Sequence, residues 1–169
     1  GLGLSRPAWL SVALLFVVGA AIRVSNAVFY PTAWGFDAKF NWEYVELLRE
    51  SWALRAPDTA WATSHPPLYY YLAGAVDVLA GYPDPVLAVA LIRGIGVIAG
   101  LASVVLAVRL VQRVDPGNAR RALFAAALLL FLPAHIYMSA MLNEEILAAA
   151  FTSLAIFLTV GAVLEPAEP

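Results

Sequence analysis

The chain has 169 residues and a net charge of −2, with 62% hydrophobic residues, 13% charged residues and a mean hydropathy of +0.79. Because a soluble domain has about half apolar and about a quarter charged residues, this composition excludes an ordinary soluble domain and favours a membrane protein. The net charge gives no reason to expect a nucleic-acid partner. The chain contains no cysteine, which excludes disulfide bonds and thiolate metal sites.

Four apolar segments predict membrane-spanning helices, because crossing a bilayer takes about 20 residues. We place these spans at residues 8–27, 86–110, 122–141 and 146–164. The first resembles a signal peptide, but its apolar core is long for one and no small-x-small cleavage site closes it. The chain lacks an initiator methionine and stops just after the last apolar segment, so we expect a fragment of a single transmembrane domain.

Residues within the spans predict how the helices pack. Gly96 and Gly100 form a small-xxx-small pair, which allows another helix to approach closely. Pro133 is expected to break the third span, because proline lacks a backbone donor and clashes with the preceding turn.

The loop between the first two spans, residues 28–85, is predicted to hold two helices that lie in the membrane interface. In residues 37–52, apolar and charged side chains follow separate helical faces, which is typical of an interfacial helix. The apolar face consists of Phe36, Phe40, Leu47 and Leu48, and the charged face of Lys39, Glu43, Glu46 and Glu50. Residues 67–80 form an apolar run that is too short to span a bilayer.

The distribution of charge predicts the orientation of the chain. Residues 109–121 carry four arginines and one aspartate, so the positive-inside rule predicts that this turn is cytoplasmic. If residues 67–80 do not cross the bilayer, Asp37 and His65 share the outer surface with the turn before the last span. If they do cross, that turn lies opposite Asp37. The charge count favours the first arrangement, an all-α polytopic fold with about four spans and two outer juxtamembrane helices.

Two acidic residues are candidates for catalysis. Asp37 follows the first span, where it either caps the predicted helix and opposes its dipole or acts as a general base at the membrane surface. Glu144 and Glu145 begin the last span, where acids complement the helix dipole and Asn143 is a suitable cap. Alternatively, Glu144 faces the loop as a second catalytic carboxylate. The sequence leaves both choices open.

His65 is a candidate ligand-binding residue. It stands before Pro66 and Pro67, which are expected to begin the second loop helix, with Ser64 or His65 as its cap. His65 is otherwise suited to bind phosphate or to contribute to a metal site. One histidine with scattered acids is a weak metal signal, so the metal stays unknown and a divalent cation is left open. No motif predicts a nucleotide or redox cofactor.

Arg23 and Arg93 lie inside predicted spans and outside the arginine-rich turn, at places where a charge is costly and often functional. Arg23 lies late in the first span and either snorkels to the headgroups or faces inward towards an anionic ligand. Arg93 lies near the outer end of the second span and is a second candidate for anion binding.

The most specific motif of the chain is the run Ser64-His65-Pro66-Pro67-Leu68-Tyr69-Tyr70-Tyr71. It follows Arg23 and Asp37, and it precedes Leu91-Ile92-Arg93-Gly94 and the pair Asn143-Glu144. In order and spacing, these motifs resemble the N-terminal part of the dolichyl-phosphate-mannose–protein mannosyltransferase and aminoarabinose-transferase group of GT-C-type glycosyltransferases. The resemblance covers most of the chain as separate short motifs.

The resemblance implies an inverting transferase that moves a sugar from a polyprenyl- or dolichyl-phosphate donor to a protein or lipid acceptor at the outer or lumenal membrane face. It implies catalytic roles for Asp37 and Glu144. The substrate-binding candidates are His65, Arg93, Arg23, Asn143 and Tyr69. Many members carry an Asp-Glu pair in the first loop, whereas Ala38 follows Asp37 here, which leaves open whether Asp37 acts alone. We expect a bacterial or archaeal plasma membrane, and a fragment that is inactive alone.

Two other classes of function also fit the sequence. A transporter or flippase brings charges to helix ends and breaks as well, but it is expected to hold its key groups near the membrane midplane. A non-catalytic polytopic anchor would have interfacial helices that bind a partner, with no convergence of Asp37 and Glu144.

Overall fold

The computed structural model describes residues 6–164, and this part of the chain is helical, with no β-strand. Its elements are α1 (Arg6–Phe29), α2 (Ala38–Glu50), the 3-10 turn η1 (Trp61–Ser64), α3 (Leu68–Leu79), α4 (Pro85–Val114), α5 (Ala119–Phe131), α6 (Pro133–Ser139) and α7 (Glu145–Leu164). The predicted all-α fold is confirmed.

Three helices, α1, α4 and α7, are long and apolar enough to cross a membrane. The pair α5 and α6 adds a fourth span if it is counted as one, although it bends by 59° at the break between the two helices. Helix α3 has 12 residues, too few to cross a bilayer on its own. The described part of the chain is therefore a polytopic membrane protein with three or four spans.

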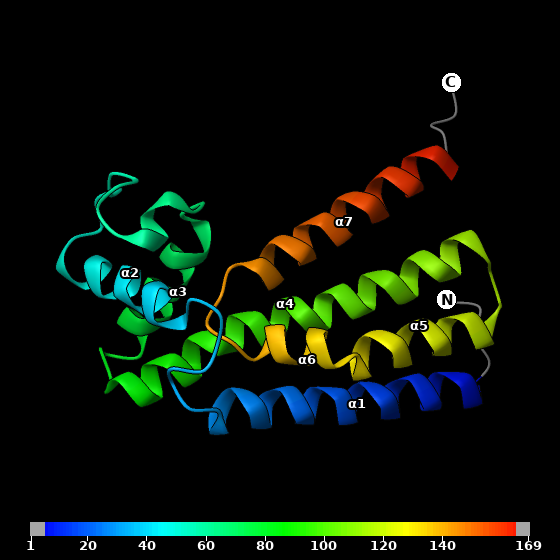
Figure 1. Cartoon of the computed structure of the whole chain (residues 1–169). Helices are drawn as coiled ribbons and strands as arrows, with labels where there is room; N and C mark the ends of the chain where they lie inside the picture. The colour runs from blue at the N-terminus through cyan, green and yellow to red at the C-terminus, as the bar shows by residue number, and fades with distance from the viewer. Residues whose placement is uncertain (1–5, 165–169) are drawn as a thin grey trace.

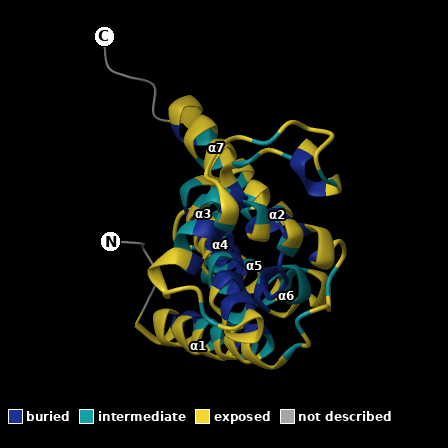
Figure 2. Cartoon of the chain, turned by 90° about the vertical axis from the view of Figure 1, so that its left-hand side faces the viewer, coloured by how far each residue is buried: buried dark blue, intermediate teal, exposed yellow. Residues whose placement is uncertain are grey.

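Helix α4 lies at the centre of the bundle and packs against α1, α5, α6 and α7 (Figure 1). Helices α2 and α3 lie at one end, together with the turn between α6 and α7. The turn between α4 and α5 lies at the opposite end, beside the start of α1. Buried positions gather around α4, while α1 and α7 are largely exposed (Figure 2).

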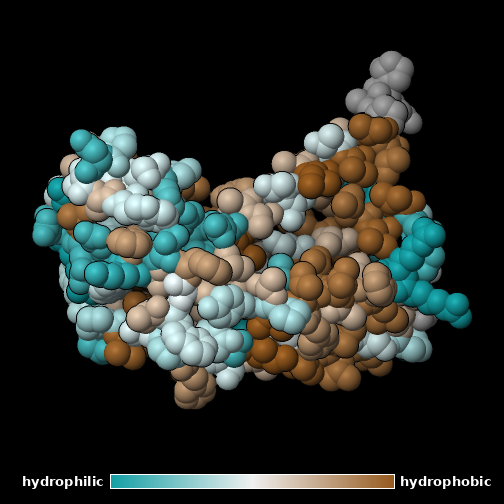
Figure 3. Space-filling model, in the orientation of Figure 1, coloured by the Kyte–Doolittle hydropathy of each residue, from teal (hydrophilic) through white to brown (hydrophobic). Residues whose placement is uncertain are grey.

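On the face seen in Figure 3, apolar side chains gather on the bundle between two hydrophilic ends. More than half of the surface of each of these side chains is exposed: Leu10, Leu14, Phe124, Phe151 and Val163. Leaving so much apolar surface in water costs roughly 25 cal/mol per Å², so this surface faces lipid. The larger hydrophilic end carries α2 and α3.

Two glycines of α4 allow α6 to approach closely, as their spacing predicts. A Cβ on Gly96 would lie 2.8 Å from the backbone oxygen of Ser139, and one on Gly100 would overlap Ser139 Oγ. Any larger residue at Gly100 would therefore push α6 away from α4.

Arg23 supplies hydrogen-bond donors to the carbonyls at the helix break before Pro133. Proline has no N–H to donate to the carbonyl four residues earlier, and Arg23 Nη2 donates to that Leu129 oxygen at 3.0 Å. The remaining N–H groups of the guanidinium donate to Gly19 O, Leu130 O, His135 Nδ1 and Ser139 Oγ. Because its side chain is fully buried, Arg23 does not snorkel to the headgroups. It faces inward, as one of the two interpretations predicts, but towards backbone oxygens.

The buried face of α2 differs from the predicted apolar face. Ala38, Asn41, Tyr44, Val45 and Leu48 are buried. In contrast, Phe36 and Phe40 of the predicted apolar face are 72% and 37% exposed, so the face that packs against the protein is a different one. The helix turns Asn41 inward, where its amide is hydrogen bonded, and this rotation carries the two phenylalanines outward. The four predicted charged residues of α2 are exposed, in agreement with the sequence.

A bidentate ion pair joins α2 to α3. Arg49 Nε and Nη2 donate to the two carboxylate oxygens of Asp77, each at 2.7 Å. The guanidinium also lies over the rings of Trp42 and Tyr82, at 5.1 and 5.7 Å from their centroids. Asp77 is only 1% exposed, so Arg49 supplies the partner that a buried carboxylate requires.

Candidate functional site

His65 and Glu144 meet at the end of the bundle that carries α2 and α3. Glu144 lies in the turn before α7, and its Oε1 is 2.5 Å from Nδ1 of His65 in the loop before α3. The two side chains are 25% and 20% exposed, so a ligand can reach a pair that is partly shielded from water. Among the predicted site residues, the structure brings these two into direct side-chain contact.

Tyr70 and Asn41 complete this cluster. The hydroxyl proton of Tyr70 faces two acceptors, Asn41 Oδ1 at 2.8 Å and Glu144 Oε2 at 3.2 Å. Asn41 Nδ2 donates to the Leu142 carbonyl at 2.8 Å, which turns the amide oxygen towards Tyr70. One phenol therefore links α2, α3 and the turn before α7.

The proline pair explains the position of His65. A residue before proline is driven towards extended backbone, and His65 has φ −84° and ψ 158°. This geometry ends η1 and points the chain away from helix until α3 begins at Leu68. The expectation that Ser64 or His65 caps α3 is wrong, because Pro67 occupies the cap position and no side chain caps the helix.

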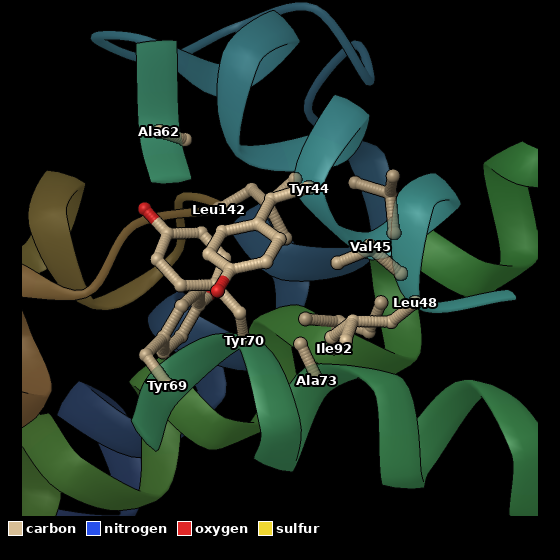
Figure 4. Packing of buried hydrophobic residues seen from close by; sticks show 10 residues of the cluster. Tyr44, Val45, Leu48, Ala62, Tyr69, Tyr70, Ala73, Ile92 and Leu142 are labelled. Carbon is tan, nitrogen blue, oxygen red and sulfur yellow. The ribbon is translucent and has the colours of Figure 1, made fainter. Parts of the chain in front are cut away.

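The cluster rests on a buried aromatic layer. Figure 4 shows the rings of Tyr44 and Tyr70 side by side, and their centroids are 4.3 Å apart. Tyr69, a predicted substrate-binding residue, packs edge-on against Tyr70 within the same buried cluster and is 2% exposed. Burial raises the pKa of Tyr70, and the Glu144 carboxylate raises it further. The phenol is therefore neutral at ordinary pH and keeps a proton to donate.

Asp37 stands at the start of α2 but does not cap it with its side chain. Its backbone is left-handed, with φ 58° and ψ 11°, a conformation that is uncommon outside glycine and that aspartate tolerates. The side chain is exposed, and it makes no hydrogen bond or ion pair within residues 6–164. Asn41 follows one helical turn later, so Asp37 lies near the cluster without joining it.

Arg93 and Asn143 hold the framework of the site. The guanidinium of Arg93 is 1% exposed, and its two strongest hydrogen bonds go to the carbonyls of Tyr30 and Pro31, each at 2.8 Å. These carbonyls follow the end of α1, so Arg93 fixes the segment that leads to Asp37. Asn143 Oδ1 accepts a hydrogen bond from Ile146 N, in the first turn of α7, at 3.3 Å, so its side chain satisfies one backbone donor of this helix end.

An exposed aromatic pair borders the cluster. The ring of Trp61 meets His65 edge-on, with centroids 4.6 Å apart, and Phe40 lies 5.3 Å from Trp61 on the other side. Trp61 is 48% exposed. A ligand bound at His65 would therefore contact the apolar rings of Trp61 and Phe40 as well as the polar cluster.

An apolar groove of about 550 Å³ opens between α3, α4 and α7. Its lining is entirely apolar and includes Leu72 and Leu147. Leu72 is two residues after Tyr70, and Leu147 is one helical turn after Glu144. The groove therefore begins close to the polar cluster and follows the membrane-spanning helices away from it.

No group of three or more His, Asp or Glu side chains able to hold a metal ion occurs in residues 6–164. His65 and Glu144 would supply two ligands to a cation.

The fold and the cluster define the class of this protein: it is a polytopic membrane protein with a histidine–carboxylate pair at one end of its bundle. No protein-family model matches the chain, and no significant match was found among curated proteins or solved structures. The likeness to GT-C-type glycosyltransferases therefore stays a prediction that depends on the motifs themselves.

Sequence reasoning did not single out Asn41 or Tyr70 as site residues. Both carried a signal: Asn41 is a polar residue in a helix whose other inward positions are apolar, and Tyr70 belongs to the tyrosine run of the His-Pro-Pro motif. The sequence alone does not say which side of α3 faces the cluster, so it could not distinguish Tyr70 from Tyr69.

Proposed function

We propose that this chain carries the reaction centre of an inverting glycosyltransferase, which moves a sugar from a polyprenyl- or dolichyl-phosphate donor to an acceptor at the outer membrane face. The observation that carries the proposal is the contact between His65 and Glu144. It joins the His-Pro-Pro loop to the Asn-Glu turn in a partly shielded cluster.

The apolar groove supports a lipid-linked donor. A polyprenyl chain is apolar along its whole length, so its binding is driven by burial of surface at roughly 25 cal/mol per Å². The groove includes Leu72 and Leu147, within one helical turn of Tyr70 and Glu144 along the chain, so we propose that the lipid bound there carries its phosphate towards the cluster.

Asp37 is our candidate for the general base. Its carboxylate is exposed and has no partner within the described part of the chain, so it is available to an acceptor. It takes the proton of the acceptor hydroxyl or amine as that atom attacks the anomeric carbon. The bond from this carbon to the phosphate oxygen breaks, the phosphate keeps the electron pair, and the configuration inverts.

His65 is our candidate for stabilising the leaving phosphate. Glu144 occupies Nδ1, which leaves Nε2 to donate to a phosphate oxygen. Glu144 orients the imidazole ring through its contact with Nδ1, so it acts through His65. Arg23 and Arg93 are no longer our candidates for this charge, because both side chains are buried and their terminal Nη groups are hydrogen bonded within the protein. Trp61 would offer the sugar ring an apolar face.

No specific observation favours a transporter. A transport pathway needs ionisable groups in a cavity near the midplane. In residues 6–164, the spans bury Arg23 and Arg93, and both side chains are committed to helix ends and breaks.

The test is sugar transfer by the intact enzyme that contains this chain, in proteoliposomes supplied with radiolabelled polyprenyl-phosphate sugars. Asp37→Asn should abolish transfer while membrane insertion stays normal, and His65→Ala should lower the rate by about 10²–10³, the typical effect of losing a charge-stabilising donor. Glu43→Gln, on the exposed face of α2, is the control and should have no effect. Full transfer by Asp37→Asn would exclude Asp37 as the base.

Donor binding is tested separately by native mass spectrometry with polyprenyl phosphate. Ala150→Trp, which fills the groove, should weaken binding without touching the polar cluster. Equal binding by the wild type and this variant would contradict a donor lipid in the groove.

A further inference from the structure

A second apolar crevice lies at the opposite end of the bundle, between α1, α4 and α5. It measures about 200 Å³. Its lining consists of Trp9, Val12, Ala13, Phe16, Val104, Val105, Val108, Arg109 and Ala126, of which Arg109 alone is charged. Along α1 it extends from Trp9 to Phe16, about 10 Å at 1.5 Å per residue. The crevice is therefore narrow and elongated, and it opens at an arginine.

The charge of this end favours an anionic ligand. In residues 6–164 it carries five arginines and one aspartate, a net of +4: Arg6, Arg109, Arg113, Arg120, Arg121 and Asp115. Asp115 is already paired with Arg121 at 2.7 Å. Arg109 is exposed and makes no hydrogen bond or ion pair within the described residues. Its charge is therefore available to a ligand.

Gln112 adds an independent observation. It is 8% exposed, and neither its Nε2 nor its Oε1 has a hydrogen-bond partner in residues 6–164. It continues the row of Val104 and Val108 at four-residue spacing, so it lies one helical turn beyond the crevice and outside its lining. An unpartnered buried amide costs about 1–3 kcal/mol, so a polar partner beside the arginine end of the crevice would be stabilising.

We propose that this crevice binds an anionic phospholipid, with one acyl chain along α1 and the headgroup phosphate on Arg109. A lipid fits better than a soluble anion, because the lining beyond Arg109 is apolar and faces the membrane interior. The headgroup is anionic because the end of the bundle is strongly positive, and basic pockets between spans on the cytoplasmic side bind such headgroups. Trp9 lies in the first turn of α1, and indole rings favour the membrane interface. The site is separate from the proposed transfer site.

The experiment measures lipid binding to the chain in nanodiscs of phosphatidylcholine that contain a minor fraction of phosphatidylglycerol, with native mass spectrometry after release. The wild type should retain phosphatidylglycerol over phosphatidylcholine about fivefold beyond their ratio in the disc, the size expected from one arginine near an anionic headgroup. Arg109→Gln should remove this preference. Ala13→Phe, which fills the crevice, should remove it while leaving every arginine in place.

Arg120→Gln is the matched control, since Arg120 is also exposed at this end but does not line the crevice. It should keep the preference of the wild type. An equal loss in Arg120→Gln would show diffuse attraction to a basic surface and overturn the proposal. An unchanged preference in Arg109→Gln would overturn it as well, whatever Ala13→Phe does. Circular dichroism of each variant separates lost binding from lost folding.

Discussion

Tyr70 is the residue on which the geometry of the candidate site depends. Its hydroxyl contacts side chains from α2 and from the turn before α7, while its own backbone belongs to α3. Asn41 Nδ2 donates to the Leu142 carbonyl, which fixes the orientation of the amide and keeps its oxygen directed at Tyr70. The phenol therefore fixes the distance between α2 and Glu144, and through Glu144 the orientation of His65.

We predict that Tyr70→Phe lowers the free energy of unfolding by about 1–3 kcal/mol, because Asn41 Oδ1 is left buried without a donor. Thermal unfolding in detergent measures this. Tyr71→Phe is the control: the Tyr71 hydroxyl donates to the Trp52 carbonyl at an exposed position, so its loss should cost less. Equal effects of the two substitutions would contradict a special role for Tyr70.

The broken helix formed by α5 and α6 is the element that most needs support from elsewhere. Within a membrane no water is available to satisfy the carbonyls that Pro133 leaves without donors. Arg23 of α1 donates to the carbonyls of Leu129 and Leu130. The break and the arginine are therefore one structural unit, and the bend of 59° depends on both.

We predict that Arg23→Leu lowers the free energy of unfolding by about 2–6 kcal/mol, since two buried carbonyls lose their donor at about 1–3 kcal/mol each. Adding Pro133→Ala should recover part of this loss, because alanine restores an N–H for the Leu129 carbonyl. Unfolding by SDS in mixed micelles measures both variants, with Arg120→Leu as the exposed control. If Pro133→Ala gives no recovery, the link between the break and Arg23 is wrong.

At the scale of the whole molecule, the contact between His65 and Glu144 places the first loop and the turn before α7 at one end of the bundle. The arginine-rich turn lies at the other end (Figure 1). The length of the apolar runs and the charge of residues 109–121 were enough to predict these positions. Hydropathy did not predict which residues meet, because Arg23 bonds to carbonyls of Leu129 and Leu130 that lie more than 100 residues away in the chain. Nor did it predict that Asn41 and Tyr70 belong to the cluster, because this depends on which faces α2 and α3 turn towards each other.

We predict that single introduced cysteines fall into two groups in intact vesicles, according to the side of the membrane from which they are labelled. The chain has no native cysteine, so each introduced one can be labelled alone. Asp58→Cys and Glu145→Cys should react with a membrane-impermeant maleimide from one side, and Pro116→Cys from the other. All three positions are exposed. Labelling of positions 116 and 145 from the same side would contradict the arrangement of spans.

The buried guanidinium of Arg23 also has a consequence for biogenesis. Its acceptors at Leu129, Leu130 and Ser139 are synthesised more than 100 residues later, so α1 enters the bilayer before they exist. A bare arginine within a span raises the free energy of insertion by about 2.5–3.5 kcal/mol on the translocon scale. The first helix should therefore linger beside the insertion machinery until the proline-broken pair arrives, and the two should leave it together.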